Sequence, residues 1–314
     1  MRRYRSRLRS DRIASCHVEH GWEEVMLKIK VLRSLIRKYA IAAIIVMGVT
    51  TVASAQGSMK NGVAHRNIDY RAGVDHADAK DMLDIFMPKD AVNVPVVVYF
   101  HGGALQRGTK AIGAGLAKQL TARGIGVVSA NYRLSPAFMH PAHMEDATAA
   151  FVWTKKNIQM YGGDPERVFV SGHSAGAYLA ALMSLDPTYL DAHGMKLSDI
   201  RGTIPISPFL YVEEKDVAPS RSKSVWGTDE SVWKKASVSP YVGAQKPPML
   251  LIYADGDDPW RREQNDRLQI QLVEHGNEVA LEQIMDRTHG SVNSKMSEDD
   301  DPGMTKVAMF IEGH

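Results

Sequence analysis

The sequence predicts an α/β fold, in which a doubly wound, mostly parallel sheet carries helices on both faces. Short, nearly continuous apolar runs recur along the chain, as in strands that are buried on both faces. Amphipathic stretches of helical length separate these runs, as in strand–helix–strand crossovers. No internal repeat and no linker rich in Gly, Ser or Pro divides residues 56–314, so we expect them to form one domain.

The predicted elements follow one another in a regular order. Five apolar runs are expected to form parallel strands: Val94–Phe100, Ile125–Ala130, Val168–Ser171, Thr203–Ile206 and Met249–Ala254. Four stretches are expected to form the helices around them: Ile112–Ala122, Met144–Met160, Ala175–Ser184 and Arg262–His275. An earlier antiparallel strand, a further strand and a last helix are expected at Leu83–Met87, Val279–Met285 and Lys306–Glu312.

Two segments depart from this rhythm. Tyr211–Pro248 combines four prolines with charged residues and the tryptophans Trp226 and Trp233, so we expect a small insertion over the functional site rather than a second domain. The tryptophans are expected either to line an acyl or aromatic pocket or to pack the insertion. The acidic run Ser297–Asp301 is expected to be a solvated loop.

The first 55 residues differ from the rest in charge. They hold 11 Lys and Arg against 4 Asp and Glu, whereas residues 56–314 hold 27 basic and 32 acidic side chains. Within this head, Tyr39–Val52 is an uncharged run of 14 residues that follows Arg37-Lys38 and precedes Ala53-Ser54-Ala55. These features are typical of a secretory signal peptide. We expect cleavage after Ala55 and a periplasmic or secreted location, because a retained membrane anchor needs about 18–20 apolar residues.

The residues before Met26 make the head long for a signal peptide. Met26 begins a more ordinary one, MLKIKVLRSLIRK, so translation is expected to start there; a basic arm with its own role is the alternative. The single cysteine, Cys16, lies in this part of the head. After cleavage, the remaining 259 residues would contain no cysteine for a disulfide or a lipid, and packing alone would stabilise the core.

Gly172-His173-Ser174-Ala175-Gly176 has the pattern G-x-S-x-G. It directly follows an expected strand and begins an expected helix, which is the setting that presents a nucleophilic serine on a sharp turn. Glycines permit such a turn and the close approach of another backbone segment. The pattern therefore favours Ser174 as a nucleophile over a glycine-rich turn without chemistry.

A second glycine motif, His101-Gly102-Gly103-Ala104, follows the most apolar expected strand. Acyl transfer develops negative charge on an oxygen, and backbone N–H groups aimed at that oxygen stabilise the transition state by several kcal/mol, about 3 for a single donor. Glycines let the backbone come close enough to donate. A plain turn at the end of the strand is the alternative interpretation.

A nucleophilic serine needs a base, and the base needs a carboxylate to orient it. The strand Met249–Ala254 ends at three candidate acids: Asp255, Asp257 and Asp258. His289 follows the last expected strand and precedes the last helix. The chain order serine, acid, histidine is that of one large class of hydrolases.

Together these motifs resemble the α/β-hydrolase superfamily, and within it the esterase/lipase group with an HGG oxyanion motif, which includes hormone-sensitive-lipase-like carboxylesterases and arylformamidase-like enzymes. The pieces that carry the resemblance, besides the two glycine motifs, are Tyr132-Arg133-Leu134, Glu145-Asp146-Ala147, Gly162-Gly163-Asp164-Pro165, Leu250–Asp257 and His289. They span about three-quarters of residues 56–314 in the expected order. At Ala104-Leu105 the chain departs from both subfamilies, which carry glycine and an aromatic residue, or Tyr-Trp.

The resemblance implies roles for individual residues. Ser174 would be the nucleophile and His289 the general base and acid. Asp257 would orient His289, and it is preferred to Asp255 and Asp258 because of its distance from the start of its strand. The oxyanion would be bound by the N–H groups of Gly103, Ala104 and Ala175, with Gly102 shaping the turn.

These residues predict a serine hydrolase that cleaves small carboxylic esters through an acyl-enzyme, without a metal or organic cofactor. An amide or formamide hydrolase, or a peptidase, on the same residues is one alternative; a non-catalytic binding protein of the same fold is the other. His140 and His143 have the spacing of metal ligands, but the start of a helix that lines the site is the favoured interpretation. No basic stripe suggests nucleic-acid binding, and no stable membrane anchor is expected after cleavage.

Overall fold

The computed structural model describes residues 56–59, 62–71, 73, 79–214 and 223–314. Contacts divide the chain into two compact units, Met1–Ala53 and Ser54–His314. The first unit, the predicted signal peptide with its cleavage site, and the expected start at Met26 lie outside the described residues. In the described part of the chain, no helix has the length and apolarity needed to cross a membrane.

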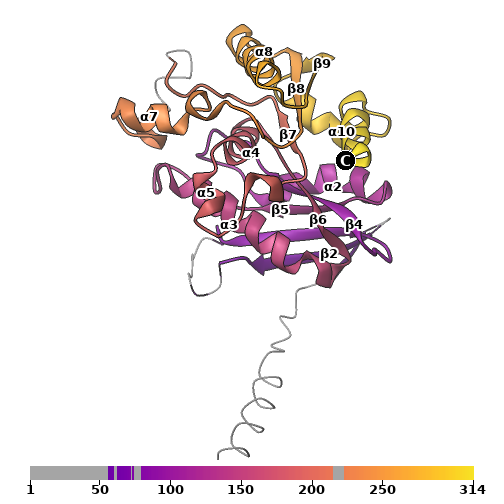
Figure 1. Ribbon diagram of the computed structural model, residues 1–314. Coiled ribbons are helices and arrows are strands. Elements are labelled where there is room, and N and C mark those ends of the chain that lie inside the picture. The colour runs from indigo at the N-terminus through magenta and orange to yellow at the C-terminus, as the bar shows by residue number, and fades with distance from the viewer. Residues whose placement is uncertain (1–55, 60–61, 72, 74–78, 215–222) are drawn as a thin grey trace, which may run out of the picture. The chain divides into compact units, whose positions relative to one another are not determined.

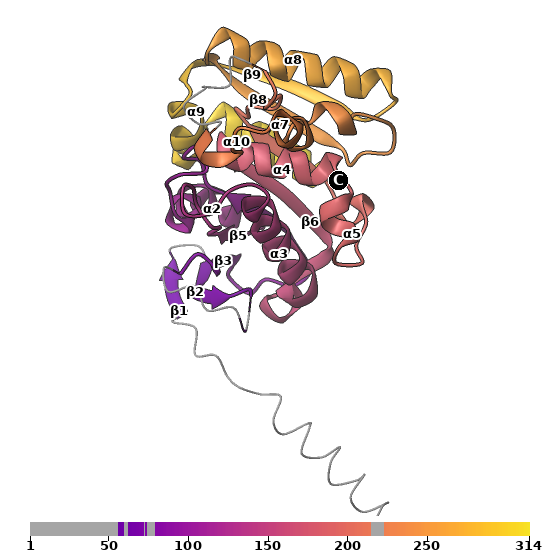
Figure 2. The same cartoon turned by 90° about the vertical axis from the view of Figure 1, so that its left-hand side faces the viewer.

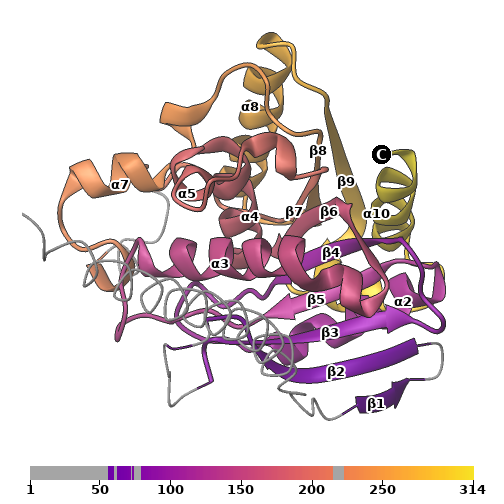
Figure 3. The same ribbon diagram turned by 60° about the horizontal axis from the view of Figure 1, so that its bottom comes forward.

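The described strands form one sheet of nine, in the order β1-β2-β3-β5-β4-β6-β7-β8-β9 (Figure 1). Their bounds are Gln56–Met59, Gly62–Asp69, Met82–Pro88, Val94–Phe100, Gly126–Ala130, Gly163–His173, Thr203–Ile206, Met249–Gly256 and Val279–Thr288 for β1 to β9. From β5 to β9 all neighbours are parallel. β1, β2 and β3 pair antiparallel and lie side by side at one edge (Figure 3).

Helices connect the parallel strands. Their bounds are Gly113–Ala122 (α2), Ala142–Asn157 (α3), Ala175–Leu185 (α4), Thr188–Asp191 (α5), Glu230–Ala236 (α7), Pro259–Glu274 (α8), Ser291–Ser294 (α9) and Pro302–Gly313 (α10). Short 3-10 turns occupy Lys110–Ile112, Ile158–Tyr161, Leu197–Asp199, Ser239–Tyr241 and Lys295–Ser297. In Figure 2, α3, α4 and α8 lie one above the other along the sheet.

Alternate side chains of each central strand enter two separate hydrophobic cores. In β4, Val96 and Val98 pack with residues of α3, α4 and α8. Val97 and Tyr99 point the other way and pack with α2 and α10. Because both faces are covered, β4 must be apolar at every position, which explains its continuous apolar run. The predicted fold class, a mostly parallel sheet with helices on both faces, is confirmed.

Several expected boundaries were wrong. α8 and α10 begin earlier than expected, because Asp258 and Asp301 precede a proline that starts each helix. β6 begins at Gly163, earlier than the expected strand Val168–Ser171, and Gly163 pairs with Val94 of β4. β1 and β2 were not predicted, because the apolar signal of their sequence is weak.

The acidic run Ser297–Asp301 is not a uniformly solvated loop. Asp301 is buried, accepts the N–H of Met304 as the N-cap of α10, and pairs with Arg287 at 2.9 Å. The carboxylate of Asp301 thus caps a helix, although the composition of the run predicted a solvated loop.

The order of the strands reverses around β4. The chain passes from β4 to its neighbour β5 and then crosses back to β6, on the other side of β4. In open α/β sheets, the loops that follow the two neighbouring strands at such a reversal run to opposite sides of the sheet. They leave room for a ligand at the carboxyl ends of these strands. The two glycine motifs follow β4 and β6, so both lie at this point.

Candidate active site

Ser174 lies in the tight turn between β6 and α4. Its φ of 54° and ψ of −112° are unusual for a residue with a side chain. A Cβ atom on Gly176 would lie 2.0 Å from the carbonyl oxygen of Phe100, and one on Gly172 would lie 2.6 Å from that oxygen. Both positions need glycine because the turn packs directly on the end of β4, and this contact holds the strained serine in place.

Three loops bring Ser174, His289 and Asp257 into one hydrogen-bonded chain. His289 Nε2 lies 3.0 Å from Ser174 Oγ, and His289 Nδ1 lies 2.6 Å from Asp257 Oδ1. With its proton on Nδ1, the imidazole donates to the carboxylate and accepts the serine hydroxyl. Asp257 is buried, whereas the His289 side chain is 38% exposed. This arrangement can activate a serine as a nucleophile and return its proton later.

The geometry distinguishes among the three candidate acids. Asp257 contacts His289, whereas Asp255 accepts the backbone N–H of Arg287 at 2.9 Å. Asp258 occupies the N-cap position of α8. Of these three, Asp257 is therefore the one whose carboxylate orients the imidazole.

Asp257 is held on its other side as well. Oδ2 accepts the Ser207 hydroxyl at 2.6 Å and the backbone N–H of Ala254 at 2.9 Å. Burial by itself raises the pKa of Asp257, but the hydrogen bonds from His289, Ser207 and Ala254 outweigh burial and lower it. The carboxylate is therefore ionised at neutral pH. Ser207, which follows β7, was not predicted, since nothing in the local sequence links it to an acid 50 residues away.

The loop after β4 lies against the serine turn. A Cβ on Gly102 would lie 3.0 Å from His173 Nδ1 and 3.4 Å from Ser174 Cβ. Gly103 and Ala104 follow with φ of 122° and 59°, which turn the backbone sharply. Ala175 is the first residue of α4, and its N–H has no acceptor within the helix. All four predicted oxyanion residues thus lie in the two segments that meet at Ser174.

His101 precedes this loop and is fixed by contacts with Tyr132. Its ring stacks on Tyr132 with centroids 4.3 Å apart, and Tyr132 donates its hydroxyl to the His101 carbonyl at 2.7 Å. Burial lowers the pKa of His101 to about 4, so the ring is neutral. A Cβ on Gly108 would collide with this ring, which explains glycine there.

His173, the second residue of G-x-S-x-G, touches the loop of His289. Its Nε2 lies 2.7 Å from the His289 carbonyl oxygen, and the two rings are 4.8 Å apart. Burial, and then the nearby His289, lower the pKa of His173 to about 4. The neutral ring donates Nε2–H to that carbonyl. The sequence motif contained His173, but its function as a support was not predicted.

The described part of the predicted insertion packs beside these loops. Gln106 Nε2 donates to Ser224 Oγ at 2.7 Å, and His140 N donates to the Val225 carbonyl at 2.8 Å. Trp226 is buried against Tyr178 and Phe209, so it packs the interior rather than lining an open pocket.

Trp233 is partly buried and donates its indole N–H to the Gly227 carbonyl at 3.1 Å.

His140 and His143, which have the spacing of metal ligands, lie within hydrogen-bond distance of protein hydroxyl groups. His143 Nε2 lies 3.1 Å from Ser135 Oγ, and His140 Nε2 lies 3.3 Å from the Tyr189 hydroxyl. Among the residues that the structure describes, no group of three or more His, Cys, Asp or Glu is arranged to hold a metal ion.

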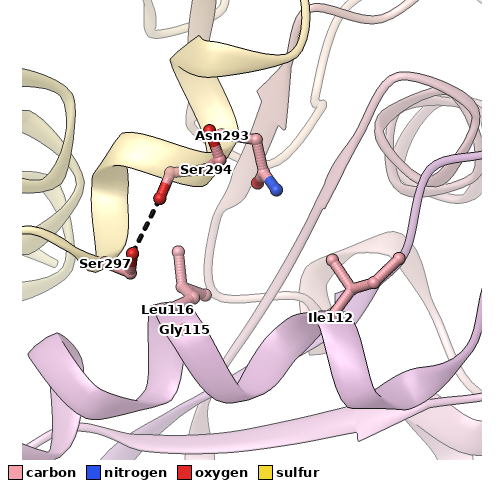
Figure 4. A pocket seen from close by; sticks show the side chains of 6 residues that line it. All are labelled: Ile112, Gly115, Leu116, Asn293, Ser294 and Ser297. Atoms are coloured by element: carbon pink, nitrogen blue, oxygen red, sulfur yellow. Dashed lines mark hydrogen bonds between the residues drawn. The ribbon is translucent and has the colours of Figure 1, made fainter.

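One described cavity, of about 230 Å³, lies between α2 and the segment formed by α9 and the 3-10 turn Lys295–Ser297 (Figure 4). Its lining residues are Ile112, Gly115, Leu116, Asn293, Ser294 and Ser297. None of the predicted site residues lines it. Asn293 accepts the Tyr99 hydroxyl at 2.8 Å, so one wall of the cavity ties α9 to β4.

Comparisons with known proteins agree with this fold. Esterase LipC of Mycobacterium tuberculosis (strain ATCC 25618 / H37Rv) is 35% identical over 132 residues, which cover 40% of this chain and 33% of that esterase. The probable isoprenylcysteine alpha-carbonyl methylesterase ICMEL1 of Oryza sativa subsp. japonica is 41% identical over 103 residues, covering 32% and 24%. The chain thus spans about a third or less of the length of these curated relatives.

Solved structures share the fold at low identity. A truncated carbohydrate esterase from gut microbiota has a TM-score of 0.70 at 18% identity, covering 84% of this chain and 99% of its own. Esterase 2 of Thermogutta terrifontis with bound propionate has a TM-score of 0.62 at 21% identity, covering 79% and 92%. The family model described as BD-FAE matches residues 83–272, more than half of the chain. The resemblance to the esterase/lipase group of α/β-hydrolases is confirmed, and the chain belongs to the BD-FAE family.

Proposed function

We propose that this chain is a serine hydrolase that cleaves small carboxylic esters by way of an acyl-enzyme. The observation that carries the proposal is the hydrogen-bonded chain Ser174–His289–Asp257 on three separate loops. Ser174 also adopts a strained backbone conformation, and strained residues of this kind cluster at functional sites.

The reaction proceeds in two halves. His289 Nε2 takes the hydroxyl proton as Ser174 Oγ attacks the ester carbonyl, and the tetrahedral intermediate collapses with cleavage of the carbon–oxygen bond to the alcohol. His289 gives its proton to that departing oxygen, which leaves an acyl-serine. Water then loses a proton to His289 and attacks the acyl carbon. Collapse releases the carboxylic acid and returns the proton to Ser174 Oγ.

Backbone groups stabilise the oxyanion of each intermediate. The N–H groups of Gly103, Ala104 and Ala175 are the proposed donors, and Gly102 allows the loop to approach the serine. Ala175 also stands at the N-terminus of α4, where the helix dipole favours negative charge. Asp257 keeps the proton of His289 on Nδ1 and stabilises the imidazolium that forms.

Support for ester substrates also comes from the names of similar proteins. LipC and ICMEL1 are described as esterases, and so are the two solved structures. These names set the first substrates for testing: short acyl esters, acetylated sugars and feruloyl esters in one panel. The esters that give the highest kcat/KM would define the acyl and alcohol groups that the site accepts.

The test of the proposal is the variant Ser174→Ala assayed with p-nitrophenyl acetate. We expect kcat/KM to fall by about 10⁴-fold or more, because the nucleophile is lost. Ser231→Ala, which changes an exposed serine of α7, is the matched control and should retain full activity. Circular dichroism of both variants checks the fold. Retained turnover in Ser174→Ala would overturn the proposal.

Two further measurements distinguish the alternatives. A fluorophosphonate probe should label Ser174 of the folded wild-type chain, and failure to label would favour a non-catalytic binding protein. Faster cleavage of an anilide or formamide than of an ester with the same acyl group would favour an amide hydrolase or a peptidase.

Export of the chain is part of the proposal. Removal of residues 1–55 would leave a net acidic protein without cysteine. Intact mass and N-terminal sequencing of the protein recovered from the periplasm or medium would test it, with Gln56 as the expected first residue. A mature protein that retains residues before Gln56 would contradict cleavage after Ala55.

A further inference from the structure

Two neighbouring residues contact His289 at different places. His173 ends β6, and Ser174 follows it directly. Ser174 Oγ lies 3.0 Å from the imidazole Nε2 of His289, whereas His173 Nε2 lies 2.7 Å from the backbone carbonyl oxygen of His289. The turn that carries the nucleophile therefore holds the base twice, once by its ring and once by its backbone.

The ring of His173 is partly buried and contacts two loops. A Cβ on Gly102 would lie 3.0 Å from His173 Nδ1, so the loop after β4 packs closely against this nitrogen. The ring of His289, in the loop after β9, lies with its centroid 4.8 Å away and is tilted by 39°. Because both loops restrict the ring, the position of its Nε2 relative to Ser174 is well defined.

The hydrogen bond between His173 and His289 has one possible direction. Burial, and then the nearby His289, lower the pKa of His173 to about 4, so the ring is neutral and carries one N–H group. A carbonyl oxygen can only accept, so the proton is on Nε2 and His173 is the donor. The length of 2.7 Å is at the short end of the usual range for such bonds, which indicates close contact.

The other contacts of His289 do not connect its backbone to the nucleophile. Asp257 fixes the rotation of the imidazole at Nδ1, but it lies in the loop after β8. His289 follows β9, and the register between β8 and β9 shifts between Ala254 and Gly256, just before this point. Proton transfer needs the base within about 2.6–3.2 Å of the hydroxyl. The bond from His173 thus meets a need that the irregular strand pairing leaves open.

We propose that His173 is a positioning residue for the reaction, whose Nε2–H bond to the carbonyl of His289 fixes the distance between the base and the Ser174 hydroxyl. The inference rests on the proposed ester hydrolysis at Ser174. It gives a function to the second residue of G-x-S-x-G. His173 neither binds the substrate nor transfers a proton, so its loss should affect the chemical steps rather than substrate binding.

The test is to measure kcat and KM for p-nitrophenyl acetate in wild type, His173→Leu, His173→Asn and His173→Gln. The amide nitrogen of glutamine can take the place of Nε2, whereas that of asparagine is one carbon too short and leucine has no donor. A misplacement of about 1 Å can cost about 10²-fold in rate, so kcat should fall by about 10²-fold in His173→Leu and His173→Asn. His173→Gln should recover about tenfold or more of this loss. Both halves of the reaction use His289 and slow together, so KM should stay within about threefold of wild type.

His65→Leu is the matched control, because His65 is a partly buried histidine of β2 whose ring packs on Tyr161. It should retain the kcat of the wild type. Circular dichroism and urea denaturation of every variant check the fold.

Three results would overturn the proposal: wild-type kcat in His173→Leu and His173→Asn, equal loss of kcat in His173→Gln and His173→Asn, or loss of the fold in all three His173 variants. The proposed function is tested separately. Turnover that persists in Ser174→Ala would reject ester hydrolysis at this site, whereas an inactive Ser174→Ala beside fully active His173 variants would reject only the function given to His173.

Discussion

The helices α4 and α8 both support the candidate site, but they are built in opposite ways. All eleven residues of α4 are buried, and most are Ala and Leu. Of the sixteen residues of α8, five are buried, and three of these are the polar residues Arg261, Gln264 and Asn265. Apolar packing holds α4, which begins directly after Ser174. Hydrogen bonds of buried polar side chains hold α8, which begins two residues after Asp257.

The polar face of α8 holds the chain that follows β7. Gln264 Oε1 accepts the N–H of Leu210 at 2.8 Å, and Asn265 Nδ2 donates to the Pro208 carbonyl at 3.2 Å. Arg261 bonds the Ser207 carbonyl in the same way. A loop without regular structure needs partners for its buried backbone groups, and α8 supplies them. Close apolar packing therefore positions Ser174, whereas hydrogen bonds position the segment around Asp257.

The largest loss in the free energy of unfolding is expected from Gly176→Ala in α4. Alanine inside a helix usually stabilises it by about 0.5–1 kcal/mol relative to glycine. Here the added Cβ would lie 2.0 Å from the Phe100 carbonyl oxygen, which is backbone and cannot move easily. We expect a loss of about 3 kcal/mol in the free energy of unfolding, measured by urea denaturation, together with lower activity.

Gly243→Ala is the control for that variant, because nothing lies within 4 Å of its Cβ position. It should change the free energy of unfolding by less than about 0.5 kcal/mol. A stabilised Gly176→Ala protein would show that the turn at Ser174 does not depend on close contact with β4.

An intermediate effect is expected from Gln264→Ala in α8. The change removes the acceptor for the buried N–H of Leu210, so the free energy of unfolding should fall by about 2 kcal/mol. Glu263→Ala alters the exposed neighbour and should stay within about 0.5 kcal/mol of wild type. Equal stability of the two variants in urea denaturation would contradict the role assigned to the polar face.

The smallest effect is expected from Ser207→Ala, and it should depend on pH. The pKa of Asp257 is lowered from 3.8 in the folded protein, so its ionised form stabilises the fold above pH 3.8 and this contribution is lost as the pH falls through the lowered value. Without the Ser207 hydroxyl, the free energy of unfolding should fall by about 1 kcal/mol at pH 7.

Urea denaturation of this variant and of wild type between pH 3 and 7 checks the prediction. The difference between the two proteins should shrink as the pH falls below 3.8. A difference that is constant over this range would mean that Ser207 stabilises the fold independently of the charge on Asp257. Ser239→Ala, which removes an exposed hydroxyl bonded to Glu213, provides a matched comparison.

Much of the fold was predictable because its signals are local. The continuous apolar runs of β4 and β8 follow from burial on both faces, and G-x-S-x-G predicts the turn at Ser174 because glycine is required on both sides of it. β1 and β2 could not be found in this way, since the pairing of β2 with β3, and of β1 with β2, supplies the structure that their own residues only weakly favour.

The sequence by itself determined the type of fold and the residues that carry the proposed chemistry: Ser174, His289 and an acid among Asp255, Asp257 and Asp258. Only the tertiary structure decided which acid meets His289, and it added Ser207, Arg261 and the bond from His173 to the supporting groups. The physical reason is distance along the chain. Backbone periodicity and glycine sterics act within a few residues, whereas these hydrogen bonds and charges join loops that follow β6, β7, β8 and β9 and meet only when the sheet has formed.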